Sequence, residues 1–196
     1  MSRSVASWGN NLMDKFALSA PLPLVKLAGR FLFWPVALSQ HVMYRLGWFP
    51  WYSEIVKTSS GGRLLLGGLP WPHSMQTQLV GKEHVSAVVN LVSEKKIEIP
   101  GIERCDVPMT DFVHPEKSEV EKAVDFIENS LKNGKTVYVH CRAGKGRSAT
   151  VVMCWLVSRM GYDPLSAQQF LQSRRPQILN NLHSRQVVQA FHRPTD

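Results

Sequence analysis

Apolar positions in several short stretches of this chain follow the patterns of buried strands. Residues 85–92 (VSAVVNLV) form a continuous β-branched run, which is typical of a strand buried on both faces. Residues 136–140 (TVYVH) form a second strand of this kind. Residues 63–70 (RLLLGGLP) are predicted as a short strand, which is terminated by two glycines and a proline. Residues 102–109 are predicted as a further short strand.

Helical periodicity separates these strands. Residues 118–133 are predicted as a helix, with Ser118 as N-cap and Gly134 as the stop signal. Its apolar positions fall at helical spacing: Val120, Ala123, Val124, Ile127 and Leu131. Further helices are predicted over residues 75–84, 147–160, 164–173 and 181–193.

Strands that alternate with helices predict an α/β domain from about residue 51 to 193, with a mainly parallel central sheet flanked by helices. Residues 51–60 are predicted as a boundary, because KTSSGG supplies a loop there. Ligands of such sheets bind at the carboxyl ends of the strands. Cys141 follows one of these strands directly, so we expect it at that edge.

The first fifty residues differ in character from this domain. Residues 31–50 have about the length of a membrane span, but polar residues and a proline interrupt them, and the ~20 apolar residues of a span are missing. A basic, aromatic, acid-poor segment is instead predicted to be helical and to lie in the headgroup region of a membrane. The alternative is that this segment only packs on the domain.

Charge and composition narrow the possibilities. The chain has 196 residues and a formal net charge of +8, which suits nucleic acid, an anionic membrane or a phosphorylated substrate. Residues 1–53 contribute half of this charge, and the start MSRSVASW has transit-peptide character. The three cysteines, Cys105, Cys141 and Cys154, form no CxxC or Cys/His spacing, which argues against a disulfide framework or a zinc site.

The loop after residues 136–140 has the composition of an anion cradle. It reads HCRAGKGRS, and five residues separate Cys141 from Arg147. Such a loop can curl so that its backbone N–H groups surround one anion, with Gly144 and Gly146 permitting positive φ and a close backbone approach. The helix that begins at Arg147 adds its positive end, and Arg147 offers a planar fork for two phosphate oxygens.

The same features favour a thiolate, so we expect a depressed pKa for Cys141 and an attack of its sulfur on phosphorus. Water would then hydrolyse the cysteinyl-phosphate, while the Ser148 hydroxyl helps the sulfur to leave. His140 is expected to brace the loop. The general acid for the leaving group is predicted to be Asp111, in a proline-flanked loop, with Asp106 and His114 as competitors.

These residues resemble those of the cysteine-dependent dual-specificity phosphatases. HCRAGKGRSAT (residues 140–150) matches their HCxxGxxRS signature at every signature position. RLLLGGLP resembles the opening strand and turn of that family, and VPMTD (residues 107–111) its general-acid loop. FLQSRRPQILNN (residues 170–181) is similar to the helix and Arg-Pro element that supports the phosphate loop. The resemblance implies a dual-specificity phosphatase-like fold for residues 51–196, as the catalytic domain, and a targeting and membrane-associating role for residues 1–50.

A closer resemblance is to the mitochondrial protein tyrosine phosphatase subfamily, which acts as phosphatidylglycerophosphate phosphatase in cardiolipin synthesis. It rests on residues 30–55 and on the doubly basic loop with Arg142 and Lys145. It implies a mitochondrial, inner-membrane-associated enzyme. The subfamily has a Glu-Glu-Tyr-Glu stretch after the strand at 85–92, whereas this chain has Glu94 followed by two lysines.

The sequence therefore predicts a phosphatase with a phospholipid substrate, such as phosphatidylglycerophosphate or a phosphoinositide, and with a membrane surface as partner. Extra cations suit a substrate with a second phosphate, so the predicted substrate-binding residues are Arg142, Ala143, Gly144, Lys145 and Gly146. The alternatives are a cytoplasmic dual-specificity protein phosphatase, in which Arg142 and Lys145 project to solvent, and a non-catalytic phosphate-binding module. Neither a metal nor an organic cofactor is predicted, because thiolate chemistry needs neither, and no motif supports nucleic-acid binding.

Overall fold

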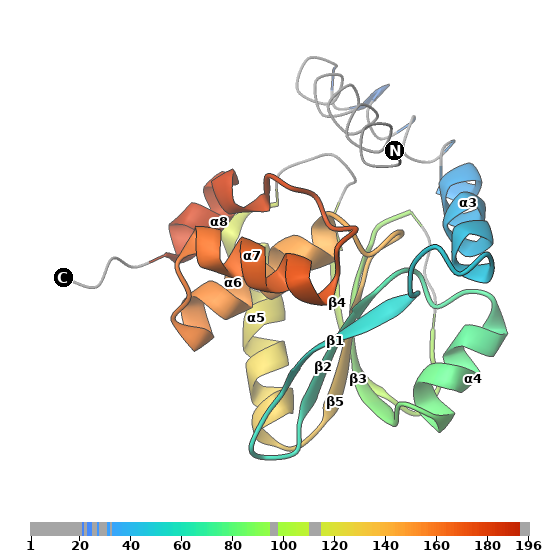
Figure 1. Cartoon of the computed structure of the whole chain (residues 1–196), viewed down its shortest axis with the longest axis horizontal. Helices are drawn as coiled ribbons and strands as arrows, with labels where there is room; N and C mark the ends of the chain where they lie inside the picture. Colours follow the sequence, from blue (N-terminus) through green and yellow to red (C-terminus); the bar gives the residue numbers. More distant parts are fainter. Residues whose placement is uncertain are drawn as a thin grey trace.

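The structure is a computed structural model, which describes residues 33–94, 98–109 and 115–192 together with positions 21, 23, 24, 27 and 31. Its strands form one five-stranded sheet in the order β1-β2-β5-β3-β4 (Figure 1). The strands are β1 (Tyr52–Lys57), β2 (Arg63–Gly67), β3 (Val85–Val92), β4 (Glu103–Met109) and β5 (Thr136–His140). The α-helices are α3 (Phe33–Arg45), α4 (His73–Gly81), α5 (Lys117–Lys132), α6 (Arg147–Met160), α7 (Pro164–Arg174) and α8 (Gln186–Phe191), and η1 (Leu182–Ser184) is a 3-10 turn.

The pairing of the strands confirms the predicted α/β fold with a mainly parallel sheet. β2, β5, β3 and β4 are parallel neighbours, and β1 alone of the described strands runs antiparallel, beside β2. His140 at the end of β5 lies opposite Gly67 on one side and Asn90 on the other. Met109 lies opposite Val92. The carboxyl ends of the parallel strands therefore meet at one edge, and the loop after β5 begins there.

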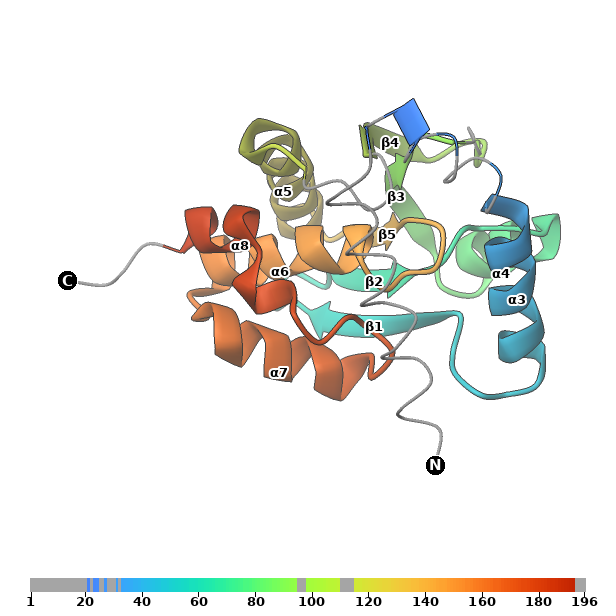
Figure 2. The ribbon, with the colours of Figure 1, turned by 90° about the horizontal axis from the view of Figure 1, so that it is seen from above.

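Helices cover both faces of the sheet (Figures 1 and 2). Helices α5 to α8 lie on one side and α4 with α3 on the other. The alternation of β5 divides its side chains between two cores. Val137 and Val139 belong to the large core beneath α5 and α6, whereas Tyr138 belongs to a smaller core with Leu79 of α4. Burial of these apolar side chains is the main force that fixes the sheet between its helices.

Two local expectations are wrong, and one strand is not predicted at all. Residues 52–57 form the strand β1, which the sequence pattern does not indicate, and the turn after them lies in the predicted loop KTSSGG. Helix α5 is capped by Glu116, not by Ser118, and the Glu119 side chain accepts a hydrogen bond from the Glu116 N–H at 3.2 Å. The last predicted helix is divided into η1 and α8.

Helix α3 belongs to the predicted membrane-associating extension. Phe33 and Ala37 are buried, and Phe33 packs with Leu69 and Val92 of the domain. Leu38, Leu46 and other large apolar side chains of the same segment are exposed. Among the described residues, no helix is both long and apolar enough to cross a membrane.

Candidate active site

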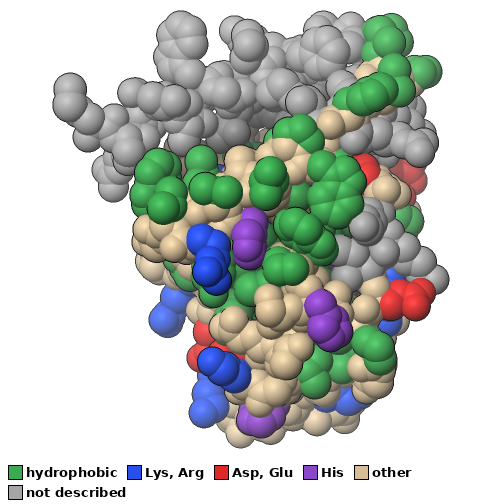
Figure 3. Space-filling view, turned by 90° about the vertical axis from the view of Figure 1, so that its right-hand side faces the viewer, with side chains coloured by type: hydrophobic (Ala, Val, Ile, Leu, Met, Phe, Trp, Pro, Cys, Tyr) green, Lys and Arg blue, Asp and Glu red, His purple; other side chains and the backbone are tan. Residues whose placement is uncertain are grey.

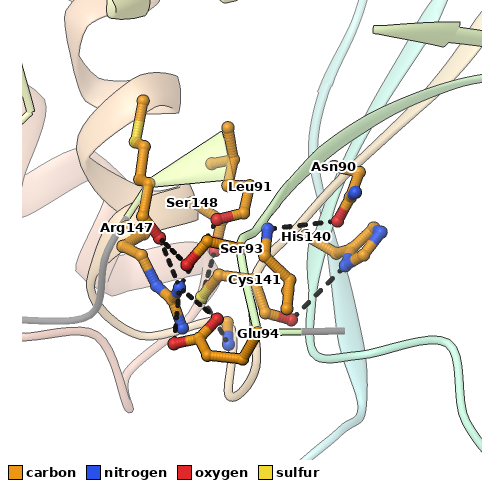
Figure 4. Close-up of polar contacts among 11 residues, drawn as sticks. Asn90, Leu91, Ser93, Glu94, His140, Cys141, Arg147 and Ser148 are labelled. Atoms are coloured by element: carbon orange, nitrogen blue, oxygen red, sulfur yellow. Dashed lines mark hydrogen bonds and ion pairs between the residues drawn. The ribbon is translucent and has the colours of Figure 1, made fainter. Parts of the chain in front are cut away.

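The loop from Cys141 to Arg147, called the catalytic loop below, connects β5 to α6 at the carboxyl edge of the sheet. Cys141 is buried, and its sulfur accepts two hydrogen bonds (Figure 4). The Gly144 N–H lies 3.3 Å from Sγ, and the Ser148 Oγ lies 3.2 Å from it. Donors directed at sulfur stabilise a thiolate more than a thiol, and the N-terminus of α6 adds its positive end. The geometry therefore favours a nucleophilic sulfur at this position.

Gly144 shapes the loop around that sulfur. Its φ is +68°, in the left-handed region, and a Cβ there would lie 2.5 Å from the carbonyl carbon and oxygen of Gly67. A side chain at this position is therefore excluded by strain and by contact. Gly146 differs from the expectation, because its φ is −111° and it needs no left-handed conformation. It precedes α6 as the N-cap, and Ala143 is half-buried in the same loop.

Arg147 is held by an acidic partner that we did not predict. Both side chains are almost fully buried, with exposed fractions of 4% for Arg147 and 7% for Glu94. The Arg147 Nη1 donates to the two carboxylate oxygens of Glu94, at 3.0 and 3.2 Å (Figure 4). It also donates to the carbonyl oxygens of Met109, at 2.8 Å, and Leu91, at 3.4 Å. The ends of β3 and β4 thus fix the guanidinium beside Cys141.

The signal for Glu94 was present in the sequence. An acidic residue that follows a buried parallel strand within two residues lies at the edge where ligands bind. From the sequence alone, Glu94 stands out only as the start of a departure from the subfamily pattern. The structure shows instead that this carboxylate is the ionic partner of Arg147, so the departure begins after it, at the two lysines.

Arg142 and Lys145 contact the extension and do not project to solvent. The Arg142 side chain is 4% exposed, and its guanidinium carbon lies 6.0 Å from the ring centroid of Phe33 in α3. The Lys145 ammonium lies 4.9 Å from the ring centroid of Phe49. Burial, and the positive charge of Arg175, lower the pKa of Lys145. Both basic side chains therefore lie between the catalytic loop and the aromatic residues that precede the domain.

Arg175, from the Arg-Pro element, ties the same two parts together. It is fully buried, and its Nε donates to the Gly144 carbonyl oxygen at 2.8 Å. Its other nitrogens donate to the carbonyl oxygens of Pro50, at 3.3 Å, and Trp51, at 3.2 Å, and to the Ser53 hydroxyl, at 3.3 Å. Burial lowers the pKa of Arg175 to about 10. The guanidinium stays charged at neutral pH because these acceptors replace water.

His140 lies behind the nucleophile. Its Nδ1 is 3.4 Å from the Cys141 carbonyl oxygen, and its ring stacks on Tyr138, with centroids 5.6 Å apart. The Tyr138 hydroxyl donates to the Gly68 carbonyl oxygen at 2.5 Å. Burial lowers the pKa of His140 to about 4, so the imidazole is neutral at physiological pH. Its surroundings are those of a side chain that supports the loop.

Of the three candidate general acids, the structure describes only Asp106. Asp111 and His114 lie outside the described residues, although Met109, two residues before Asp111, contacts Arg147. Asp106 is in β4, where it accepts a hydrogen bond from the Asn90 amide at 2.7 Å and pairs with Arg104 at 2.6 Å. Those contacts give Asp106 a structural position.

The other two cysteines lie in the apolar core. Cys105 is in β4 and Cys154 in α6, and both belong to the large hydrophobic cluster. Burial raises the pKa of Cys154 to about 12 and also raises that of Cys105, so both remain thiols. Within the described ranges, no three acidic, histidine or cysteine side chains gather as they would around a metal ion.

Comparison with known proteins places this geometry in context. The family model described as the dual specificity phosphatase catalytic domain matches residues 69–193. The chain is 31% identical over 179 residues to phosphatidylglycerophosphate phosphatase PTPMT2 of Arabidopsis thaliana, covering 87% of this chain and 75% of that protein. It is 29% identical over 178 residues to phosphatidylglycerophosphatase and protein-tyrosine phosphatase 1 of Rattus norvegicus, covering 84% and 89%.

Solved structures show the same arrangement of strands and helices. The crystal structure of PTPMT1 in complex with PI(5)P matches with a TM-score of 0.62 and 28% identity, over 72% of this chain and 94% of that one. DUSP15 matches with a TM-score of 0.60 and 19% identity, over 71% of this chain and 86% of that one, which is a likeness of fold alone.

Proposed function

The chain belongs to the dual specificity phosphatase family and is a cysteine-dependent phosphatase, and from this premise we propose that it hydrolyses a phosphomonoester of a phospholipid. The substrate that we propose is phosphatidylglycerophosphate or a phosphoinositide. The observation that carries the reaction is the buried sulfur of Cys141, which accepts hydrogen bonds from Gly144 and Ser148 beside the fixed guanidinium of Arg147.

The proposed reaction has two steps. In the first, the Cys141 sulfur attacks phosphorus, the S–P bond forms and the P–O bond to the alcohol breaks. The electron pair goes to the leaving oxygen, which takes a proton from Asp111. Arg147 and the backbone N–H groups of the loop donate hydrogen bonds that stabilise the negative charge on the phosphoryl oxygens. Asp111 stays a prediction here, supported by its place after the end of β4.

In the second step, water attacks the cysteinyl-phosphate. The new O–P bond forms, the S–P bond breaks, and Asp111 accepts the proton of the water. The sulfur leaves as a thiolate, and the Ser148 hydroxyl at 3.2 Å stabilises it by a hydrogen bond. The neutral His140 contacts the backbone of the loop, which supports a bracing role for it and none in proton transfer.

Three observations support a lipid substrate. The relatives from Arabidopsis thaliana and Rattus norvegicus bear the names of phosphatidylglycerophosphate phosphatases, and PTPMT1 has been crystallised with PI(5)P. Residues 15–53 contain four basic residues and no acidic one, so they suit an anionic membrane. Arg142 and Lys145 add two cations to the catalytic loop, beside that segment. We infer a membrane-associated enzyme, mitochondrial in view of the transit-like start of the chain and the resemblance noted above.

The name of the Rattus norvegicus relative also contains protein-tyrosine phosphatase, which keeps phosphoprotein as the second candidate substrate. The test compares kcat/KM for phosphatidylglycerophosphate, phosphoinositides and phosphopeptides in the same detergent. Cys141→Ser serves as the inactive control. A lipid preference of tenfold or more is the expected result, and a preference for phosphopeptides would overturn the proposal.

A second experiment tests which basic side chains bind the substrate. Arg142→Gln and Lys145→Gln should each reduce kcat/KM for the lipids more than for an aryl phosphate. Arg174→Gln is the matched control, because Arg174 is an exposed arginine next to Arg175 and outside the catalytic loop. Equal losses on all substrates would remove Arg142 and Lys145 from the set of substrate-binding residues.

A further inference from the structure

Helix α3 and its flanks have an exposed apolar stripe, whose member Trp34 also contacts the domain through the Trp71 ring, with centroids 5.4 Å apart. Its members recur at i, i+3, i+7, i+11 and i+15, which keeps them on one face of a helix. They are 42–74% exposed, although all are large and apolar, and Trp48, in the turn that follows, is 68% exposed. The stripe consists of Phe31, Trp34, Leu38, Val42 and Leu46. Figure 3, which looks onto this side of the molecule, shows hydrophobic side chains gathered there.

The opposite face of α3 is already occupied by the domain. Phe33 and Ala37 are buried there, 3% and 1% exposed, and Phe33 packs on Leu69 and Val92. The exposed stripe therefore cannot be explained as the core-facing side of the helix. An apolar face of this size on a protein surface marks a site for another partner.

The charge of the segment indicates which partner. Residues 15–53 include Lys15, Lys26, Arg30 and Arg45 and contain no aspartate or glutamate. A helix with an apolar face, tryptophans and basic flanks lies in the plane of an anionic bilayer surface, with its apolar side in the headgroup and acyl boundary. Trp34 and Trp48 are residues of the kind enriched at that boundary.

The inner face of α3 connects this surface to the catalytic loop. The Phe33 ring lies under the guanidinium of Arg142, and the ring of Phe49, in the turn after α3, lies under the ammonium of Lys145. Arg142 is therefore separated from the outer stripe by at least the diameter of α3, ~10 Å. A helix at the bilayer surface sits ~5–10 Å deep, so the catalytic loop would lie at the level of the headgroups.

We propose that α3 with the turn at residues 46–48 is the face that docks on an anionic phospholipid bilayer, and that Phe33 and Phe49 hold the catalytic loop to this face. The proposal rests on the proposed lipid phosphatase function and deepens it. It assigns the partner, a bilayer surface, to particular residues, and makes the extension a wall of the active site.

The test uses the full chain and vesicles of phosphatidylcholine with phosphatidylglycerol. The double variant Leu38→Ser/Leu46→Ser should bind the vesicles about tenfold or more weakly in co-sedimentation. The matched control is Met160→Ser/Leu165→Ser, which changes two apolar residues of similar exposure, 49% and 53%, on α6 and α7. Neither double variant should change kcat/KM for a soluble aryl phosphate or the midpoint of thermal unfolding.

Two results would overturn the docking face. One is equal vesicle binding by the two double variants. The other is a stripe variant that keeps vesicle binding but loses self-association in light scattering, which would make the stripe an interface between copies of this chain. If the protein binds vesicles of pure phosphatidylcholine equally strongly, the proposed preference for anionic lipid is wrong.

A second variant tests the link to the loop. Phe49→Leu keeps an apolar side chain but removes the ring under Lys145, so vesicle binding should persist while KM for a vesicle-embedded substrate rises at least threefold. The loss of kcat/KM for an aryl phosphate should be smaller than the loss on vesicles, because Lys145 is proposed to contact the lipid headgroup. An unchanged KM on vesicles would show that the ring does not position Lys145.

A monomeric short-chain phosphatidylglycerophosphate tests the proposed lipid phosphatase activity without a membrane, so failure of the docking face and failure of the proposed function can be distinguished. If the stripe variant binds vesicles normally but the short-chain lipid is still preferred to phosphopeptides, the docking face fails and the lipid phosphatase stands. If vesicle binding depends on the stripe but phosphopeptides are preferred, the docking face stands and the substrate assignment fails.

Discussion

The buried ion pair between Glu94 and Arg147 permits a quantitative prediction. The Arg147 Nη1 has four acceptors, of which the Glu94 carboxylate supplies two, and the carbonyl oxygens of Met109 and Leu91 the others. Glu94→Gln keeps the shape and one acceptor but removes the charge. We therefore expect the Arg147 guanidinium to keep its position, but its orientation to be fixed less firmly.

The magnitude follows from the burial of both partners. Removing one partner of a buried ion pair costs about 3–5 kcal/mol, because the other charge is left without compensation. The remaining carbonyl oxygens and the glutamine oxygen recover about half, which leaves about 2 kcal/mol. For a chain of this size, 2 kcal/mol lowers the midpoint of thermal unfolding by about 4–8 °C. If the same energy is lost in the transition state, kcat/KM falls by up to about 30-fold.

The assay measures kcat/KM for a soluble aryl phosphate, the affinity for orthovanadate and the thermal midpoint. Glu54→Gln is the matched control, because Glu54 also pairs with an arginine, Arg63, but is 42% exposed, and an exposed pair contributes less than about 1 kcal/mol. A Glu94→Gln protein with kcat/KM, vanadate affinity and midpoint all equal to those of the control would refute the assignment of Glu94 as the residue that orients Arg147.

Three further predictions concern the nucleophile, the acid and the brace. Cys141→Ser should abolish turnover yet still bind orthovanadate or substrate, and turnover near that of the unchanged protein would exclude the covalent mechanism. Asp111→Ala should slow an alkyl phosphate far more than an aryl phosphate, whereas equal losses would assign the acid elsewhere. Burial lowers the His140 pKa from 6.5 to about 4, so only the unfolded chain binds this proton between those values. Stability present above pH 6.5 should fall by about 3 kcal/mol toward pH 4, and His140→Asn should flatten this slope in denaturant titrations.

Local patterns predicted most of the elements because burial imposes them directly. Residues 85–92 and 136–140 are strands as expected, and the helix at 147–160 has the predicted bounds. The pattern does not indicate β1 because YSEIVK is short and two of its six residues are charged, and an edge strand with one polar face gives a weak signal. Its partner, β2, fixes it through pairing that only the folded sheet supplies.

The chemistry of the catalytic loop was readable because its residues are consecutive. The contacts that hold the loop were not, since they join distant parts of the chain. Glu94 and Arg147 are 53 residues apart, and Phe33 precedes Arg142 by an even longer stretch. No periodicity links such pairs, so the sequence left two possibilities for Arg142 and Lys145, the pocket or solvent. The structure adds the aromatic face of the extension as their neighbour.

The contacts of Arg175 bear on how this protein could be taken apart. Three of the four acceptors of its buried guanidinium belong to residues 50–53, at the junction of extension and domain. A chain shortened to begin after Ser53 would keep every residue of the catalytic signature but leave a buried cation with one acceptor, the Gly144 carbonyl oxygen. A foreign leader joined to residue 54 would supply backbone carbonyl oxygens at positions 50 and 51, but it would lack the Ser53 hydroxyl and the buried Trp51 side chain that anchors this segment. The unit to transfer, or to compare among relatives for substrate preference, therefore begins upstream of the sheet, at or before Pro50.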